Sequence, residues 1–164
     1  KALHLEVTKM NALQQARITP RAIQNPRSWQ QRLGLIMHYP HSEQEIQHYI
    51  DSEVFNAFKS VQKEFQRRQL EVSIQSIDGG MELRVDHHNE INFVYQVVAQ
   101  ETVPPSFMAE ATPNEVKYYQ AEVFLREGGQ NYDVMDWTLE DLLQDIIDQY
   151  ERHLHFLSLV RTAE

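Results

Sequence analysis

The spacing of apolar residues changes twice along this chain, and that change restricts the fold more than any other feature. Over residues 42–65 the apolar residues recur at helical spacing, whereas over residues 70–97 they alternate with polar residues. From residue 138 to residue 157 the helical spacing returns. A strand-forming stretch therefore lies between two amphipathic helices.

Both helices have a capping signal at the start. Ser42 with Glu45, and Thr138 with Asp141, stand at the two positions of a capping box, in which side chains satisfy the first free amides of a helix. The predicted buried side of the first helix comprises Ile46, Tyr49, Ile50, Val54, Ala57, Phe58, Val61 and Phe65. That of the last helix comprises Leu139, Leu142, Leu143, Ile146, Ile147, Tyr150, Leu154 and Leu157.

Three strands are expected between residues 70 and 97. Residues 70–75 and 81–86 alternate apolar and polar side chains, and Asp78-Gly79-Gly80 between them is a hairpin signal, because glycine accepts positive φ angles. A second turn at residues 87–90 leads to a third strand at 91–97. These strands form an antiparallel meander.

The second half of the sheet is less regular. The proline-containing stretch 101–114 is expected to be a long loop, and residues 117–126 a fourth strand. Gly128-Gly129 is interpreted as a turn into a short fifth strand at 132–135. Gly128-Gly129-Gln130 also matches a peptidyl-tRNA hydrolysis motif of release factors, but its neighbours Glu127 and Asp133 are acidic, so the turn interpretation is favoured.

This order of elements predicts an α+β fold, an antiparallel sheet of about five strands with helices packed on one face. We expect residues 1–27 to be a basic arm and linker, because prolines interrupt a weakly helical pattern. Residues 28–164 are expected to form a single globular α+β domain. Residues 28–39 fit a helical turn or a strand equally well.

Charge is distributed unevenly. The chain carries a net charge of −9, and residues 1–40 hold six basic residues against Glu6, or +5, which leaves −9 − 5 = −14 for the remainder. A negative total argues against a nucleic-acid partner. The candidate contacts of the arm with a membrane, through anionic lipid head groups, or with the acidic body are Arg17, Arg21, Arg27 and Arg32.

The totals exclude several classes of protein. The chain has no cysteine, and no run approaches the roughly 18 apolar residues that span a bilayer. It lacks the order of a signal peptide and does not begin with Met, so we expect a fragment excised from a longer protein. The absence of cysteine fits a reducing compartment without proving one.

No arrangement of residues predicts an enzyme, a cofactor or a metal. His153 and His155 point about 200° apart on a helix, and the adjacent pair His87-His88 is unsuited to converge on one ion. The pair Asp145 and Asp148 is interpreted as part of a solvated helix face. Catalytic, cofactor-binding and metal-binding residues are therefore all expected to be absent.

Aromatic residues mostly fall at core spacing, with one exception. Tyr118 and Phe124 flank Gln120 and Glu122 on the second face of the predicted fourth strand. If no helix covers that face, the two rings form a patch, which makes Tyr118 and Phe124 a candidate interface.

One family resemblance covers roughly residues 28–161. Residues 117–137, KYYQAEVFLREGGQNYDVMDW, residues 145–157, DIIDQYERHLHFL, and the Trp-x-x-Arg-Leu stretch from Trp29 to Pro40 resemble the C-terminal extension of BetT-type choline transporters, in the betaine/carnitine/choline transporter family. Asp136 stands where we expect a glycine before Trp137.

The resemblance implies that residues 1–27 are a juxtamembrane arm and that residues 28–164 are a cytoplasmic regulatory (osmosensing) domain at the inner face of the bacterial inner membrane. The carrier it implies imports choline as precursor of the osmoprotectant glycine betaine. The implied partner of the domain is the transmembrane part of the same transporter, which binds choline; self-association is left open. The alternative is a small-molecule-binding or protein-interaction module without a role in transport regulation.

Overall fold

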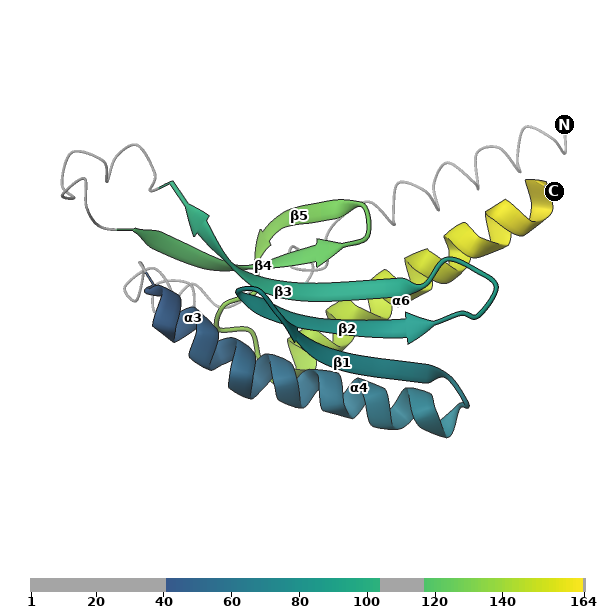
Figure 1. The fold of residues 1–164 in the computed structure, drawn as a ribbon, viewed down its shortest axis with the longest axis horizontal. Helices are drawn as coiled ribbons and strands as arrows, with labels where there is room; N and C mark the ends of the chain where they lie inside the picture. The colour runs from purple at the N-terminus through teal and green to yellow at the C-terminus, as the bar shows by residue number, and fades with distance from the viewer. Residues whose placement is uncertain (1–40, 104–116, 164) are drawn as a thin grey trace, which may run out of the picture. The chain divides into compact units, whose positions relative to one another are not determined.

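The computed structural model describes residues 41–103 and 117–163, so the predicted arm, the segment 28–39 and the segment 104–116 lie outside the described residues. The elements in chain order are α3 (Glu43–Tyr49), η2 (Ile50–Val54), α4 (Phe55–Arg67), β1 (Glu71–Ile77), β2 (Gly80–Asp86), β3 (Phe93–Thr102), β4 (Tyr118–Leu125), β5 (Gly128–Asp133) and α6 (Leu139–Ala163) (Figure 1). The five strands form one antiparallel sheet in the order β1-β2-β3-β4-β5. The predicted α+β fold is confirmed.

The first helix is uninterrupted from Glu43 to Arg67, and its middle turn, η2, is a π-helix. The predicted capping box at Ser42 is present. Ile46, Ile50, Val54 and Phe58 recur every four residues. In a regular α-helix of 3.6 residues per turn, side chains at this spacing drift around the helix and the last would turn away from the core. The wider π-turn absorbs this rotation, and all four side chains are fully buried.

The meander follows the predicted alternation. Gly79 adopts a φ of +69° in the turn between β1 and β2, as expected for a glycine in a tight hairpin. The third strand is longer than predicted, because β3 continues to Thr102, where it still pairs with Tyr118 of β4. The first two residues of the predicted loop 101–114 therefore belong to the sheet.

The turn before β5 differs from the prediction. Arg126 and Glu127 form the turn, and Gly128 and Gly129 are the first residues of β5, which ends at Asp133. Gly128 has a φ of +123°, and a Cβ atom on Gly129 would lie 2.6 Å from the Oε1 atom of Glu122, so the Glu122 side chain would have to shift. The predicted turn at Gly128-Gly129 and the strand at 132–135 were therefore wrong in position.

The helices α4 and α6 lie on one face of the sheet, as Figure 1 shows. The largest fully buried side chains of the core are Ile46, Ile50, Val54, Phe58, Leu83, Val85, Tyr95, Val97, Val123, Val134, Leu142 and Ile146. On α6 the prediction was partly wrong: Leu139, Ile147 and Leu154 are 38%, 38% and 42% exposed. Gln149 is buried instead, because its position faces the core and its amide finds a polar partner there.

Candidate functional site

The sheet face opposite the helices carries a buried carboxylate. Cross-strand register places Gln75, Glu82 and Gln96 side by side on β1, β2 and β3. Glu82 is 3% exposed, and its two oxygens accept hydrogen bonds from the Gln75 and Gln96 amides at 2.9 and 2.6 Å. Arg84 adds contacts to Oε1 at 3.1 and 3.0 Å. With so many donors the charge is compensated, and the group ties three strands together.

A second buried carboxylate, Glu122, lies on the same face in β4. It accepts hydrogen bonds from the Gln120 amide at 3.2 Å and from the Asn131 backbone N–H at 3.3 Å. Gln130 donates to the carbonyl of Gly128 within β5, so the Gly-Gly-Gln sequence is part of an edge strand. A place in a β-strand fits a structural role for Gly-Gly-Gln better than the peptidyl-tRNA hydrolysis loop that the tripeptide alone would permit.

The candidate interface residues Tyr118 and Phe124 both lie in β4, on this face. Tyr118 pairs in register with Thr102 and is 2% exposed, whereas Phe124 pairs with Gln96 and is half-buried. The structure therefore places the two rings on the predicted side of the strand, but with unequal accessibility. Their role as an interface stays a prediction.

A polar network joins the sheet to α6 inside the domain. The Oδ2 atom of Asp145 accepts hydrogen bonds from the hydroxyl groups of Tyr95 at 2.6 Å and Tyr132 at 2.7 Å, and Gln149 donates to the Tyr132 hydroxyl at 3.1 Å. Trp137 stacks on Tyr132 with ring centroids 5.8 Å apart. The interpretation of Asp145 as part of a solvated face was thus wrong.

The electrostatics of this network follow from burial. Burial raises the pKa of the Asp145 carboxyl above its ordinary value, and the two tyrosine hydrogen bonds act in the opposite direction. Burial and the neighbouring Asp145 charge likewise raise the pKa of Tyr95 and of Tyr132. Sequence reasoning missed the network; its only signal was an acidic residue directly before Ile146 on the buried side of the last helix.

Two histidines meet between the β2–β3 connection and α6. The His87 ring stacks on Tyr150 with centroids 5.7 Å apart and lies 5.4 Å from the His153 ring. The Nε2 atom of His153 lies 2.8 Å from the Ile91 carbonyl, and Arg161 forms two hydrogen bonds with Glu90. Burial, followed by the nearby His153, lowers the pKa of His87. The arrangement fastens the connection to the end of α6.

Metal-ligand geometry was searched over the described ranges 41–103 and 117–163. One group, Glu71, Asp86 and His88, offers three ligand atoms within 4.8 Å of one another. Two of the three side chains are exposed, and the Asp86 carboxylate already accepts the His88 backbone N–H at 2.7 Å. An exposed turn explains this grouping without an ion.

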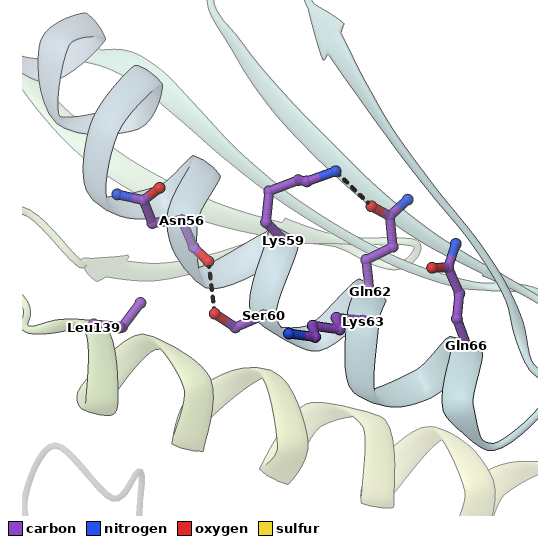
Figure 2. A pocket seen from close by; sticks show the side chains of 7 residues that line it. All are labelled: Asn56, Lys59, Ser60, Gln62, Lys63, Gln66 and Leu139. Carbon is purple, nitrogen blue, oxygen red and sulfur yellow. Dashed lines mark hydrogen bonds between the residues drawn. The ribbon is translucent and has the colours of Figure 1, made fainter.

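A shallow polar groove of about 630 Å³ lies along α4. Figure 2 shows its lining, which consists of Asn56, Lys59, Ser60, Gln62, Lys63, Gln66 and Leu139. Lys59 donates to the Gln62 side chain at 3.0 Å, and Ser60 donates to the Asn56 carbonyl at 2.9 Å. The groove wall is cationic and amide-rich, with no carboxylate among its lining residues.

The four candidate arm residues, Arg17, Arg21, Arg27 and Arg32, lie outside the described residues, as does the predicted domain boundary at residue 28. Within the described ranges, no helix is both long enough and apolar enough to cross a membrane.

Comparison with known proteins connects this chain to membrane carriers. It is 68% identical over 163 residues to a "Glycine betaine transporter" of Acinetobacter baylyi, covering 98% of this chain and 25% of the relative. It is 36% identical over 151 residues to a "High-affinity choline transport protein" of Escherichia coli, covering 88% and 22%. An "Osmo-dependent choline transporter BetT2" of Acinetobacter baylyi is 28% identical over 143 residues, covering 83% and 21%.

The chain spans about a quarter of the length of these relatives. No family model matches it. The resemblance to BetT-type choline transporters is confirmed, because proteins with such names align along nearly the whole chain. The relatives are named as transporters, which fits the prediction that this chain is not an enzyme.

Proposed function

We propose that this chain, a homologue of one segment of bacterial glycine betaine and choline transporters, is the cytoplasmic C-terminal domain that adjusts such a carrier to osmolality. The observation that carries the proposal is the identity of 68% to a named glycine betaine transporter along 98% of the chain. The word "Osmo-dependent" in the name of a further relative supports the regulatory part. Transport of choline itself would fall to the rest of the carrier.

An independent fold supports a regulatory appendage. Within residues 41–103 and 117–163, both helices and the strands β1 to β4 contribute side chains to one hydrophobic core. A unit with its own core can change its position relative to a carrier without unfolding. The domain would thereby act on transport through contacts at its surface.

The proposed signal is cytoplasmic ionic strength. Osmotic upshift concentrates cytoplasmic salt, and the Debye length shrinks from about 8 Å at physiological salt towards 3 Å at 1 M. The attraction between the basic arm, through Arg17, Arg21, Arg27 and Arg32, and an anionic surface would weaken. The described body offers such a surface, because Glu43, Glu45, Asp51 and Glu53 are exposed along one helix.

A binding module without a regulatory role is the second candidate. The Glu82 and Glu122 carboxylates with their glutamine partners give the sheet face opposite the helices a polar array whose chemistry matches a cationic or amide-bearing ligand. Saturable stabilisation by such a ligand would favour this candidate, since a ligand that binds only the folded state raises the unfolding temperature.

Uptake measurements test the proposal. Choline and glycine betaine uptake would be measured against external osmolality in cells with the intact carrier and in cells whose carrier lacks residues 28–164, at matched expression. We expect basal uptake to persist and its osmotic response to change. A Leu142→Asp carrier serves as a second variant, because a charge at this fully buried position unfolds the domain without shortening the chain. Unchanged uptake and response in both variants would refute the regulatory role.

A further inference from the structure

One ridge of α4 combines an aromatic ring with three cations. Phe55, Lys59, Lys63 and Arg67 follow one another every four residues, so they lie in one row along the helix. All four side chains are exposed, with Phe55 at 39%. The buried residues of α4, Ala57, Phe58, Val61 and Phe65, project from its other side. The ridge therefore faces solvent over about 18 Å of helix, since Phe55 and Arg67 lie twelve residues apart at a rise of about 1.5 Å per residue.

The charge of this ridge is opposite to that of its surroundings. α4 contains Lys59, Lys63 and Arg67 against Glu64 alone, or +2, within a body whose residues 41–164 sum to −14. Glu64 lies beside the row and pairs with Arg67 at 3.4 Å and Arg68 at 3.0 Å. Long-range repulsion would keep most of the body away from an anionic surface, so that this ridge would be the part that approaches it.

The neighbouring groove fits phosphate oxygens. Lys59 and Lys63 form part of its lining, and Asn56 and Gln66 contribute amide donors (Figure 2). The Ser60 hydroxyl and the Gln62 amide already donate to the Asn56 and Val72 carbonyls. Lysine binds phosphate as a point charge, and amides add neutral hydrogen bonds. Because the groove is shallow and the row is long, it suits several head groups of a surface better than one enclosed metabolite.

We propose that the Phe55–Lys59–Lys63–Arg67 ridge is a membrane-facing surface that binds the phosphate groups of anionic lipids. The inference rests on the proposed function, which places the domain next to a bilayer. The exposed ring of Phe55 would enter the interfacial region while the cations contact head groups, as in peripheral amphipathic helices. The ridge would fix the orientation of the domain, separately from any contact of the arm.

Vesicle binding tests the surface directly. The 164-residue chain would be sedimented with vesicles of phosphatidylcholine alone and with phosphatidylglycerol added, at low salt. We expect binding only with the anionic lipid, and a loss of about fivefold per cation removed in K59Q/K63Q/R67Q, because each cation near such a surface contributes about a fivefold factor in affinity. Glutamine preserves helix propensity, so circular dichroism should be unchanged.

The control variant is K117Q/R126Q/R152Q, which has the same net charge but neutralises exposed cations off the ridge. The difference between the two triple variants is the measured quantity, since residues 1–40 carry cations of their own. An equal loss of vesicle binding in both variants, or no loss in either, would overturn the proposal that the ridge binds anionic lipid. Equal binding of the wild-type chain to phosphatidylcholine vesicles with and without phosphatidylglycerol would also overturn it.

The two proposals fail in different ways. If the ridge variant binds vesicles like wild type while removal of residues 28–164 alters the osmotic response, the ridge is wrong and the regulatory role stands. If the ridge variant loses vesicle binding while that removal leaves transport unchanged, the surface exists but the domain does not regulate uptake.

Discussion

Tyr95, in the centre of β3, donates its hydroxyl proton to the carboxylate of Asp145 on α6 across 2.6 Å. Tyr95 is fully buried, and its ring also packs edge-on against Phe58 of α4, with centroids 6.0 Å apart. One side chain thus contacts both helices from the middle of the sheet. The packing of α4 and α6 depends on this polar link as well as on apolar burial.

Removing either partner should reveal that link. Tyr95→Phe deletes one hydrogen bond to a charged acceptor and should lower the free energy of unfolding by about 1–3 kcal/mol. Asp145→Ala should cost more, because the buried Tyr95 and Tyr132 hydroxyls both lose their acceptor. Urea denaturation followed by circular dichroism measures both values. A smaller cost for Asp145→Ala than for Tyr95→Phe would show that the tyrosines find other acceptors.

Lowering the pH through the range in which histidine titrates should reduce the free energy of unfolding. The folded protein lowers the pKa of His87, so the unfolded chain takes up the proton first, near its ordinary pKa of about 6.5, and protonation favours unfolding below that pH. The groups facing His87 are His153 and Arg161, which oppose its protonation, and Asp86 and Glu90, which favour it.

Chemical denaturation at pH 7.5, 6.0 and 5.0 checks this expectation. His87→Gln should flatten the loss of stability between pH 6.5 and 5.0, whereas the matched variant His88→Gln should not, because His88 is exposed in the same turn. If the free energy of unfolding falls equally steeply with pH in wild type and in His87→Gln, other titratable groups cause the loss of stability at low pH.

The turn before α6 contains a residue in the glycine region of backbone space. Asp136 has a φ of +62°, at the position where the family resemblance predicts a glycine. We expect Asp136→Gly to stay within about 1 kcal/mol of wild type and Asp136→Ala to be destabilised by about 1–2 kcal/mol, since alanine pays the steric cost of the left-handed conformation.

Thermal unfolding of the two variants tests that order. Asp136 also lies 3.5 Å from the Nε2 atom of His41, and both variants lose this contact equally, so their difference isolates the backbone effect. If the glycine and alanine variants unfold at the same temperature, the turn relaxes on substitution and the positive φ is not required.

The arm is expected to carry the salt response of the intact carrier. Replacing Arg17, Arg21, Arg27 and Arg32 with glutamine removes the cations whose attraction salt would screen, so uptake should vary less with osmolality. Uptake would be measured at several external osmolalities with expression matched, and the K117Q/R126Q/R152Q variant shows the effect of removing three cations outside the arm. An unchanged response in the arginine variant contradicts this mechanism.

Local patterns predicted most elements because their cause is local. The capping boxes at Ser42 and Thr138 depend on residues three positions apart, and both form as expected. Strand alternation likewise depends only on neighbouring residues, so β1 and β2 appear where expected. The family resemblance rested on continuous strings of residues, which the relatives confirm.

The features that sequence reasoning missed arise between elements. Asp145 looked solvated because its neighbours on the helix are acidic, and only the approach of Tyr95 and Tyr132 from two strands turns it into a buried acceptor. Gly129 lies against the Glu122 side chain of the next strand, which would have to shift to admit a Cβ atom.

The sequence by itself determined the α+β class, the element order and the relation to transporter proteins, because periodicity, caps and residue strings are properties of the chain as written. Only the tertiary structure decided which polar groups are buried together and which cations share an uncovered surface. Those outcomes depend on distances between residues far apart in sequence, such as His87 and His153 or Tyr95 and Asp145, and such distances exist only once the helices have packed on the sheet.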